Sequence, residues 1–482
     1  MDQALRQPPL VVDLDRTLVE TDLLVESILA FLSSRPLQIY RLLVWLARGK
    51  AELKSKLAER LSPDVARLPY RAECLDLIRE AKADARVVVL ATATHQRLAD
   101  EVARHLGLFD EVYGTSGGEN LKGIKKAQFL VDRFGDKGFD YVGDSRSDLP
   151  VWARARKAFT VGASKKLRET VSRNCQDTHH LRSATKPPAS VMAPYLRLIR
   201  PHQWAKNILL FLPIIAAHSF EWGVWMQAMI AFVLFSVCAS GAYVLNDLFD
   251  LQSDRAHPRK KNRPLASGAV PLRHGMVLAP ILALTGLTGA LWALPFPFFL
   301  ALSAYMVTTI FYSVYLKKKL FLDVLTLAGL YTLRVIAGGT ATSIVISPWL
   351  LAFCMFLFLS LAMAKRLAEL MVVADMGKTE TLGRAYRRSD LPMLGAMGAS
   401  SGFMSVLVLA LYINSPAVIP LYASPMVLWG ACPLLLLWIG RMLLLSHRGE
   451  MHDDPLVFAM TDPASWMIAA AVLAVVLAGT WI

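Results

Sequence analysis

The stretch NDLFDLQSDRAHPRKKNRPLASG, residues 246–268, directly follows a long apolar run. It begins with five acidic or amide side chains and continues with six basic ones. Asp247, Asp250 and Asp254 have the spacing i, i+3 and i+7, which puts them on one face of a helix. Because a charge in the middle of a bilayer costs about 2.5–3.5 kcal/mol, we expect these acids at a helix end, where they line a wet cavity.

Oxygen and water ligands of this kind suit Mg²⁺, and a diphosphate would complete the shell of the ion. The expected metal ligands are Asn246, Asp247, Asp250 and Asp254. The basic side chains that follow would contact phosphate oxygens as charged donors; they are His257, Lys260, Lys261 and Arg263. The stretch therefore predicts a diphosphate site. The plainer alternative is an ordinary charged loop, which the phasing of the acids argues against.

Around this stretch the chain is strongly apolar, with 55% hydrophobic residues among 482. From about residue 195 onward, apolar runs of roughly 20 residues recur, which is the length that crosses a bilayer as a helix. We expect about nine spans, near 204–220, 225–247, 274–294, 296–315, 322–343, 348–371, 393–413, 424–446 and 464–482. The second part of the chain is thus predicted to be an all-α membrane domain.

The loops between these spans alternate between basic and nearly uncharged. By the positive-inside rule the basic loops face the cytoplasm, and an odd number of spans then puts the carboxyl terminus outside. The first residues, MDQALRQPPL, lack a secretory signal, so we expect a cytoplasmic amino-terminal domain and a plasma (inner) membrane location. The basic loops account for the net charge of +14. The sequence has no basic stripe interleaved with aromatic residues, so we expect no nucleic-acid partner.

The amino-terminal part has the pattern of an α/β domain. Apolar strand segments at 8–20, 85–96 and 139–152 alternate with helical patterns, which predicts a parallel sheet. Residues 22–83 have helical spacing of apolar side chains. We expect a soluble domain over 1–182, a polar, proline-containing linker over 183–194 and the membrane domain over 195–482.

Asp13 and Asp15 flank Leu14 at the end of the first predicted strand. Open α/β sheets bind ligands at the carboxyl ends of their strands. Two close carboxylates repel each other unless a cation sits between them or one takes a proton, and Mg²⁺ with a phosphate meets that need. An aspartate that attacks phosphorus is a known covalent catalyst. The plainer reading is a helix cap and a turn acid.

DLDRT, VVVLAT, KGIKKAQFL and GDSRSD occur in the order found in the haloacid dehalogenase superfamily, which residues 8–165 resemble. The resemblance implies a Rossmann-like fold with Asp13 as nucleophile, Asp15 as acid and base, and Mg²⁺ held by Asp13, Asp15 and Asp144. It makes Thr92 and Lys126 phosphate-binding and Asp148 a supporting acid. Residues 22–83 would form a cap, in which LQIYRLLVWLARGK is apolar enough to touch a membrane. A non-catalytic regulatory relative stays open.

The acidic stretch together with RPLASG resembles the UbiA superfamily of intramembrane prenyltransferases, over about residues 195–482. That superfamily has nine helices. Its aromatic prenyltransferases carry a second acidic DxxxD motif after the fourth span. Here Asp323 stands in that region without a second acid four residues on, which disfavours prenyl transfer to an aromatic ring.

Further motifs resemble the decaprenyl-phosphate phosphoribosyltransferase branch. RPHQWAKN at 200–207 and HPRKKNRP at 257–264 match it, as do Tyr312, Lys317, Asp323 and Arg334. The resemblance implies phosphoribosyl diphosphate as donor and a polyprenyl phosphate lipid as acceptor. It makes Lys206, Tyr312, Lys317 and Arg334 phosphate-binding.

Plainer readings remain for these residues. Arg334 can be a structural partner for an acid on a neighbouring helix, and Lys317 and Lys206 can be flanking anchors of their spans. For Asp453 and Asp454 we favour a solvated loop over a site.

Together the two halves suggest that the soluble domain removes the 5-phosphate from the transferase product. The alternative is a prenyltransferase that joins a prenyl diphosphate to an aromatic or other small acceptor, with an independent phosphatase-like domain. A third reading is a lipid-binding anchor fused to a binding module, without turnover.

Overall fold

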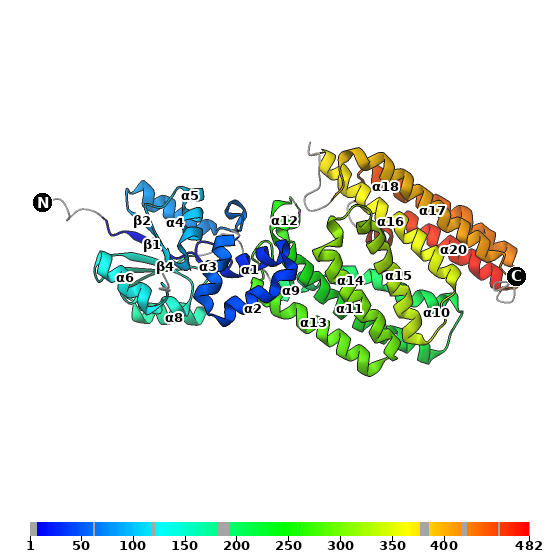
Figure 1. Ribbon diagram of the computed structural model, residues 1–482, viewed down its shortest axis with the longest axis horizontal. Coiled ribbons are helices and arrows are strands. Elements are labelled where there is room, and N and C mark those ends of the chain that lie inside the picture. Colours follow the sequence, from blue (N-terminus) through cyan, green and yellow to red (C-terminus); the bar gives the residue numbers. More distant parts are fainter. Residues whose placement is uncertain are drawn as a thin grey trace. The chain divides into compact units, whose positions relative to one another are not determined.

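The computed structural model describes residues 7–60, 63–116, 121–181, 192–257, 259–375, 385–415, 422–451 and 454–481 (Figure 1). The chain divides into two compact units. Unit 1 comprises Met1–Leu198 and Asp247–Met276, and unit 2 comprises Ile199–Asn246 and Val277–Ile482. The acidic segment therefore clusters with the amino-terminal domain. Most of the predicted linker, 183–191, lies outside the described residues, and a helix, α9, begins at Met192.

Unit 1 is built on a six-stranded parallel sheet with the order β3-β2-β1-β4-β5-β6, which confirms the α/β prediction. The strands are β1 (Leu10–Val12), β2 (Val88–His95), β3 (Glu111–Thr115), β4 (Asp140–Gly143), β5 (Lys157–Thr160) and β6 (Asp177–His180). Val11 of β1 pairs with Val89 of β2 on one side and Tyr141 of β4 on the other. These central strands are buried on both faces, so they need continuous apolar runs rather than alternation.

Helices cover this sheet and also form a separate cap. Besides α9 (Met192–Ile199), the α-helices of unit 1 are α1 (Leu23–Ser34), α2 (Ile39–Ala47), α3 (Lys50–Arg60), α4 (Ala72–Ala83), α5 (Gln96–Leu106), α6 (Ile124–Phe134), α7 (Leu149–Trp152), α8 (Lys165–Asn174) and α12 (Leu251–Ala256). Cys74 and Ile78 of α4 belong to the core that contains β1 and β2, whereas Phe31, Leu42 and Trp45 belong to a second small core. The cap is thus narrower than 22–83, because α4 packs on the sheet.

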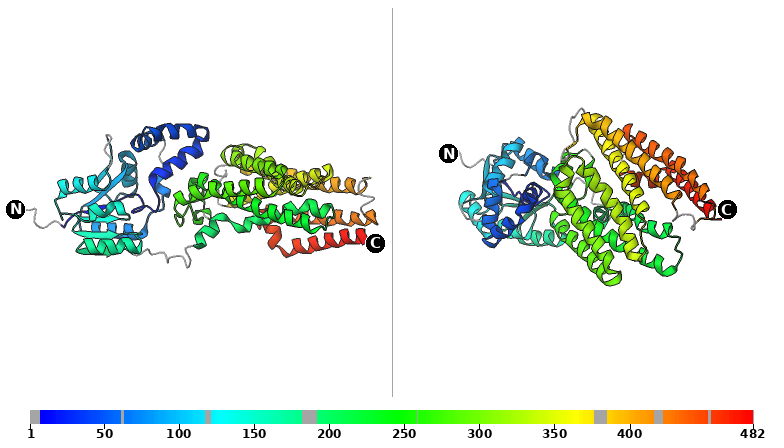
Figure 2. Two further views of the ribbon diagram at one scale, coloured as in Figure 1. Left: turned by 90° about the horizontal axis from the view of Figure 1, so that it is seen from below. Right: turned by 45° about the vertical axis from the view of Figure 1, so that its right-hand side comes forward.

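Unit 2 is helical, and its long helices run side by side in both views of Figure 2. Eight described helices are long and apolar enough to span a membrane, which confirms the all-α membrane class. They comprise or contain α11 (Trp222–Phe249), α13 (Leu272–Ala293), α14 (Phe296–Val314), α15 (Leu322–Thr342), α16 (Pro348–Asp375), α17 (Leu391–Ile413), α18 (Ala431–His447) and α20 (Pro463–Trp481).

The count of nine spans is not met among the described residues, because the first expected span is broken. Residues 204–220 fall on a 3₁₀ segment, η4 (Pro201–Phe211), and on the short helix α10 (Leu212–Ala216). Pro213 near the start of α10 lacks the N–H that would continue a helix from the preceding turn. The outer location of the carboxyl terminus rested on an odd count, and eight helices do not support it.

Candidate functional sites

The first candidate site lies at the carboxyl edge of the sheet in unit 1. Asp13 follows β1 directly and Asp144 follows β4, and these two strands are parallel neighbours. The backbone N–H of Asp13 donates to the carbonyl of Val142 at 3.1 Å, which continues the ladder up to the nucleophile position. Residues far apart in sequence therefore meet because parallel strands end at the same edge.

Lys126, in the first turn of α6, extends its side chain to this edge of the sheet. Its ammonium group donates to Asp13 Oδ1 at 2.8 Å and to the Tyr141 hydroxyl at 3.1 Å. That hydroxyl in turn donates to Asp148 at 3.0 Å. Lys126 is only 2% exposed, so its charge has to be balanced by these acids. The lysine and the acids thus form one charged network.

One group of three acids among the described residues offers oxygens within 4.8 Å of one another, namely Asp13, Asp144 and Asp148. Burial raises the pKa of Asp13 to about 7 against the pull of Lys126, and burial raises that of Asp144 to about 6 against Arg16. Carboxylates held this close and this dry stay charged only beside a cation, so the set fits a divalent ion. The sequence had expected Asp15 rather than Asp148 in this set.

Asp15 faces a different way. Its carboxylate accepts hydrogen bonds from the Leu23 backbone N–H at 2.7 Å and from the Thr94 hydroxyl at 2.5 Å. Burial, and then the charge of Asp22, raise the pKa of Asp15. Thr92 lies fully buried at the same edge, where its hydroxyl accepts from the Thr94 N–H at 3.1 Å. Asp15 is therefore set up to hold a proton beside the nucleophile position.

A cavity of about 410 Å³ opens over these acids. Cationic side chains line it together with Asp13, Asp15 and Asp144: they are Arg16, Lys54, Lys122, Lys126, Arg146 and Arg273. A pocket with carboxylates at its base and cations on its wall suits an anionic ester. Lys122 and Arg146 were not among the expected site residues, and Arg273 comes from the Asp247–Met276 segment of unit 1.

The acidic segment in unit 1 is the second candidate site. α11 ends at Phe249 and α12 begins at Leu251, with Asp250 as the residue between them, so the three acids do not share one unbroken helix. Asp247 and Asp254 are nevertheless both buried, and Arg263 donates to Asp247 at 3.1 Å and to Asp254 at 2.6 Å. Burial raises the pKa of Asp254 to about 6, although Arg263 opposes this shift. Two buried carboxylates that gather one cation fit a metal or a cationic partner.

The other residues of this segment are spread over its surface. Asn246 and His257 are half-buried, Lys260 is half-buried, and Lys261 is exposed. The Nδ1 atom of His257 accepts from the backbone of Lys260 at 3.4 Å. The structure thus brings Arg263 to the acids but leaves Lys261 on the surface.

The segment is also tied to the cap of unit 1. Arg255 donates to both carboxylate oxygens of Glu26 in α1, at 3.0 and 2.7 Å, and its Nε donates to the carbonyl of Ala266 at 3.0 Å. Both side chains are nearly inaccessible to solvent. A paired, bidentate arginine of this kind holds its two segments in one geometry.

The described part of unit 2 holds several polar clusters in a largely apolar interior, and three of them contain expected site residues. In the first, Arg334 of α15 donates to the Asn207 side-chain oxygen at 2.9 Å and to the Tyr305 hydroxyl at 3.1 Å. Its guanidinium lies 4.8 Å from the centre of the Tyr305 ring. Its hydrogen-bond acceptors among the described residues are neutral groups, namely Asn207, Tyr305 and the Leu330 carbonyl, and not a carboxylate. A buried cation on neutral acceptors is prepared for an anion.

The second cluster corrects the expectation of a solvated loop at Asp454. Asp454 is 7% exposed and accepts from Lys206 and Lys365 at 2.8 Å each and from the Tyr331 hydroxyl at 2.7 Å. It also caps the short helix α19 (Pro455–Thr461), which packs against η4 and α16. Burial raises the pKa of Asp454, but the two lysines outweigh this and hold it well below its usual range. Asp453 lies outside the described residues.

The third cluster surrounds Asp323 at the start of α15. Tyr312 donates to Asp323 at 2.8 Å, and the Arg366 guanidinium lies 2.5 Å from the same carboxylate. Arg366 also pairs with Glu369 one helical turn later in α16. Lys317 is buried beside this region, at 8% exposure. Asp323 is thus neutralised by an arginine.

The expected span 348–371 contains Lys365, Arg366 and Glu369, but the sequence analysis assigned them no role. The signal that points to them is charge inside an apolar helix. The charged stretch AKRLAEL lies within α16, which continues unbroken to Asp375. An ionisable side chain at such a position is a site candidate by default.

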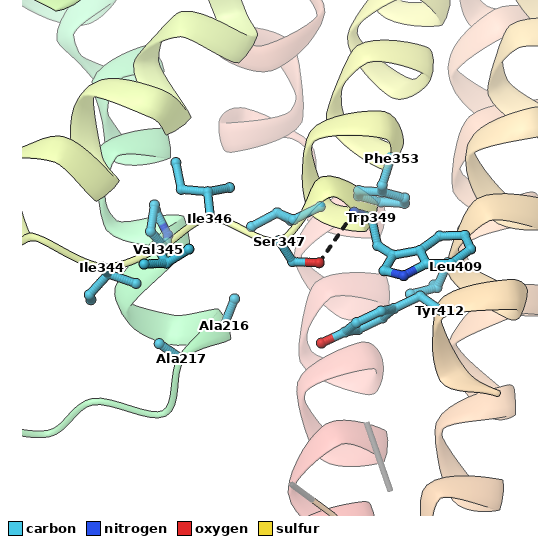
Figure 3. Close-up of a pocket in the computed structure, with 12 residues that line it drawn as sticks. Ala216, Ala217, Ile344, Val345, Ile346, Ser347, Trp349, Phe353, Leu409 and Tyr412 are labelled. Carbon is cyan, nitrogen blue, oxygen red and sulfur yellow. Dashed lines mark hydrogen bonds between the residues drawn. The ribbon is translucent and has the colours of Figure 1, made fainter. Parts of the chain in front are cut away.

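A further cavity of about 330 Å³ in unit 2 has a mostly apolar lining (Figure 3). Ile344, Ile346, Trp349 and Phe353 line it, and the Ser347 hydroxyl accepts from the Trp349 N–H at 3.2 Å. It follows the carboxyl end of α15, whereas Asp323 stands at the start of that helix. This cavity contains none of the expected site residues and suits a hydrocarbon group.

Comparison with known proteins agrees with both halves of the chain. The family described as UbiA prenyltransferase family matches residues 208–468, and haloacid dehalogenase-like hydrolase matches residues 10–152. Uncharacterized protein y4nM of Sinorhizobium fredii is 36% identical over 97% of this chain and 90% of its own length.

Two further relatives cover a smaller share of this chain. Nodulation protein NoeC of Azorhizobium caulinodans is 34% identical over 56% of this chain and 88% of its own length. Decaprenyl-phosphate phosphoribosyltransferase of Mycobacterium tuberculosis is 36% identical over 42% of this chain and 67% of its own length.

Proposed function

Because this chain belongs to the UbiA prenyltransferase family and carries a haloacid dehalogenase-like hydrolase domain, we propose that it is a bifunctional membrane enzyme. The membrane domain, residues 195–482, transfers 5-phosphoribosyl from phosphoribosyl diphosphate to a polyprenyl phosphate. The soluble domain then removes the 5-phosphate from the lipid product.

The basic interior of unit 2 is the observation that carries the transferase proposal. Lys206, Arg334 and Arg366 are each less than 9% exposed, and Lys365 joins Lys206 on Asp454. A sugar phosphate donor and a lipid phosphate acceptor together bring more anionic oxygens than a prenyl diphosphate does, and charged donors stabilise them. The relative named decaprenyl-phosphate phosphoribosyltransferase supports the same pair of substrates.

In the transfer step an oxygen of the lipid phosphate forms a bond to the anomeric carbon. The bond from that carbon to the diphosphate breaks, and the electron pair leaves with the diphosphate. We assign Asp247, Asp250 and Asp254, with Asn246, to a divalent ion that stabilises the leaving charge when bound. Arg334 and Lys206 are assigned to phosphate oxygens of the donor or acceptor, which they hold and orient.

For the phosphatase, Lys126 beside Asp13 is the supporting contact. A carboxylate oxygen of Asp13 attacks phosphorus, the bond to the ribose oxygen breaks, and Asp15 gives its proton to that oxygen. Asp15 then takes a proton from water, which attacks the phosphoaspartate and releases phosphate. Lys126 keeps the charge of Asp13 balanced, and Asp144 and Asp148 would hold Mg²⁺, which offsets the charge of the phosphate.

The location follows from the same proposal. The basic loops and the soluble domain face the cytoplasm, and the chain resides in the plasma (inner) membrane. Because both active sites are on one chain, the product meets the second site at an effective concentration in the millimolar range.

The substrates are tested with purified protein in detergent or nanodiscs, Mg²⁺ and two labelled donors. We expect phosphoribosyl diphosphate and polyprenyl phosphate to give a ribosylated lipid, identified by mass spectrometry, and Asp247→Asn with Asp250→Asn to abolish it. Release of diphosphate from a labelled prenyl diphosphate, with no ribosylated lipid, would establish the prenyltransferase alternative instead.

The second activity is tested by Asp13→Asn. We expect this variant to form the phosphoribosyl lipid at the parent rate and to accumulate it with its 5-phosphate, whereas the parent releases inorganic phosphate. Asp76→Asn, at an exposed position of α4, is the matched control and should behave as the parent. Equal release of phosphate by parent and Asp13→Asn would refute the phosphatase role.

A further inference from the structure

The cap of unit 1 exposes a patch of large apolar side chains, which we call the cap face. It consists of Leu37, Ile39, Tyr40, Leu43, Val44 and Leu46. Leu37 is 89% exposed and Leu43 is 65% exposed. Six such side chains within ten residues are far more than the isolated apolar groups that any protein surface carries, and such patches mark interaction sites.

The rest of helix α2 explains why this patch is left over. Leu42 and Trp45 point into the cap, where the Trp45 ring meets Phe31 edge-on at 5.5 Å. Leu53 and Leu57 of α3 complete that small core. Two buried residues are enough to fix α2 on the cap, so the cap face does not serve the fold. Among the described residues nothing covers it.

The charge around the cap face has one sign. Between Glu26 and Glu52 the chain has four basic residues and no acidic one; the basic ones are Arg35, Arg41, Arg48 and Lys50. Arg35 and Arg48 are exposed, and Arg41 lies 5.9 Å from the centre of the Tyr40 ring. A helix with an apolar face and flanking cations is the arrangement that lies in a membrane interface.

We propose that the cap face docks on the surface of a bilayer that contains anionic lipids. Leu43 and its neighbours enter the boundary between headgroups and acyl chains, and the arginines contact lipid phosphates. The described residues include eight helices that could span a membrane, so a bilayer is the surface expected next to this protein. A second copy of the chain fits less well, because a symmetric contact would bring the same positive charges together.

Docking would act on the phosphatase pocket through α3. Lys54 of α3 lines the cavity above Asp13 and donates to the Ala93 carbonyl at 2.7 Å. A cap held on the membrane keeps this wall of the pocket at the surface where a lipid-borne phosphate ester arrives. This consequence rests on the proposed phosphatase function, whereas the docking itself does not.

Docking is tested on the full chain in nanodiscs that contain phosphatidylglycerol and doxyl-labelled lipid. All five native cysteines are buried, so Leu43→Cys can be labelled selectively with a fluorophore. Glu169→Cys, at an exposed position of α8, is the matched control. We expect doxyl quenching at Leu43→Cys about threefold stronger than at the control, and weaker in zwitterionic lipid.

Equal quenching at the two positions would overturn the proposal. So would a fluorophore at Leu43→Cys that becomes shielded only as the protein concentration rises, since that outcome indicates a second copy.

The functional consequence is tested with Leu37→Glu combined with Leu43→Glu. We expect hydrolysis of p-nitrophenyl phosphate at the parent rate and hydrolysis of the lipid-borne ester reduced about tenfold, since added charge opposes insertion. Equal loss on both substrates would mean a folding defect and would refute the selective role. If the parent hydrolyses neither substrate, the phosphatase function fails while the quenching result still decides on docking.

Discussion

Asp454 illustrates how one side chain can organise a site from a distance along the chain. It pairs with the buried Lys206 and the partly buried Lys365, and without it both lysines would lose a counter-charge. We predict that Asp454→Asn lowers the turnover of the transferase about tenfold or more, because one lysine then loses its proton or turns away. The measurement is the rate of lipid ribosylation at saturating donor, with Asp454→Glu expected to restore part of it.

Asp462 supplies the control for this prediction. Asp462 directly precedes α20, is buried to a similar degree and pairs with Arg441 of α18. Asp462→Asn should lower thermal stability and leave turnover per folded molecule unchanged. If both variants lose turnover equally, Asp454 serves only the stability of the fold.

The buried acids of the soluble domain predict a pH dependence. The pKa values of Asp13 and Asp144, about 7 and 6, lie above those of an unfolded chain, so the folded, metal-free state favours their protonated forms. That contribution to stability is complete near pH 4 and is lost as the pH rises through 6 and 7. We predict that the melting temperature without metal falls between pH 5.5 and 8.

Mg²⁺ should reverse this loss, because it binds the deprotonated acids. The increase in melting temperature on adding millimolar Mg²⁺ is expected to be larger at pH 8 than at pH 6. A variant with Asp13→Asn and Asp144→Asn should show little of either effect. An increase that is the same at both pH values would contradict the assignment of these acids to a metal.

At the scale of elements, the close approach of α11 and α13 depends on glycine. A Cβ at Gly241 would lie 2.7 Å from the backbone oxygen of Ala279 and 2.9 Å from the backbone nitrogen of Ala283. Membrane helices pack through such small residues, since lipid offers no hydrophobic drive to hold them together. We predict that Gly241→Ala lowers the melting temperature in detergent by several degrees.

Gly395 of α17 is the matched control, because a Cβ there meets no atom within 4 Å. Gly395→Ala should be neutral or slightly stabilising, since alanine favours the helix by about 1 kcal/mol over glycine. A loss of stability of the same size in both variants would show that helix packing at Gly241 is not the cause.

At the scale of unit 1, a buried ion pair joins the cap to the acidic segment, two distant parts of the sequence. Glu26 of the cap holds Arg255, which is adjacent to Asp254 of the acidic segment. We predict that Glu26→Gln destabilises the full chain by about 3 kcal/mol, because a buried guanidinium loses its counter-charge. It should also lower transferase activity more than phosphatase activity on a soluble ester, as Asp254 shifts with its neighbour.

The test is a double-mutant cycle with Arg255→Gln, followed by thermal unfolding and both activities. The double variant is expected to lose less stability than the two single variants added together. Asp64→Asn breaks the exposed Asp64–Arg67 pair in the same unit and should cost less than 1 kcal/mol. Strict additivity at Glu26 and Arg255 would argue against the coupling.

Local patterns were enough to predict the fold classes. Apolar runs of membrane length predict spans by themselves, and apolar strands between helical segments predict a parallel sheet, because both signals reside in neighbouring residues. The same holds for Asp13 and Asp144, which follow strands that the sequence places in one sheet. Pro213 is also visible in the sequence, but the apolar length of residues 204–220 led us to count them as a span.

The sequence alone thus determined the two-part architecture and the residues that end at the sheet edge. Only the tertiary structure decided that Asp148 joins Asp13 and Asp144, that Asp15 turns to Thr94, and that Asp454 holds Lys206 and Lys365. The physical reason is that these partners come from segments far apart in the chain. Their meeting depends on how helices such as α19 and α16 pack, and no local pattern encodes that packing.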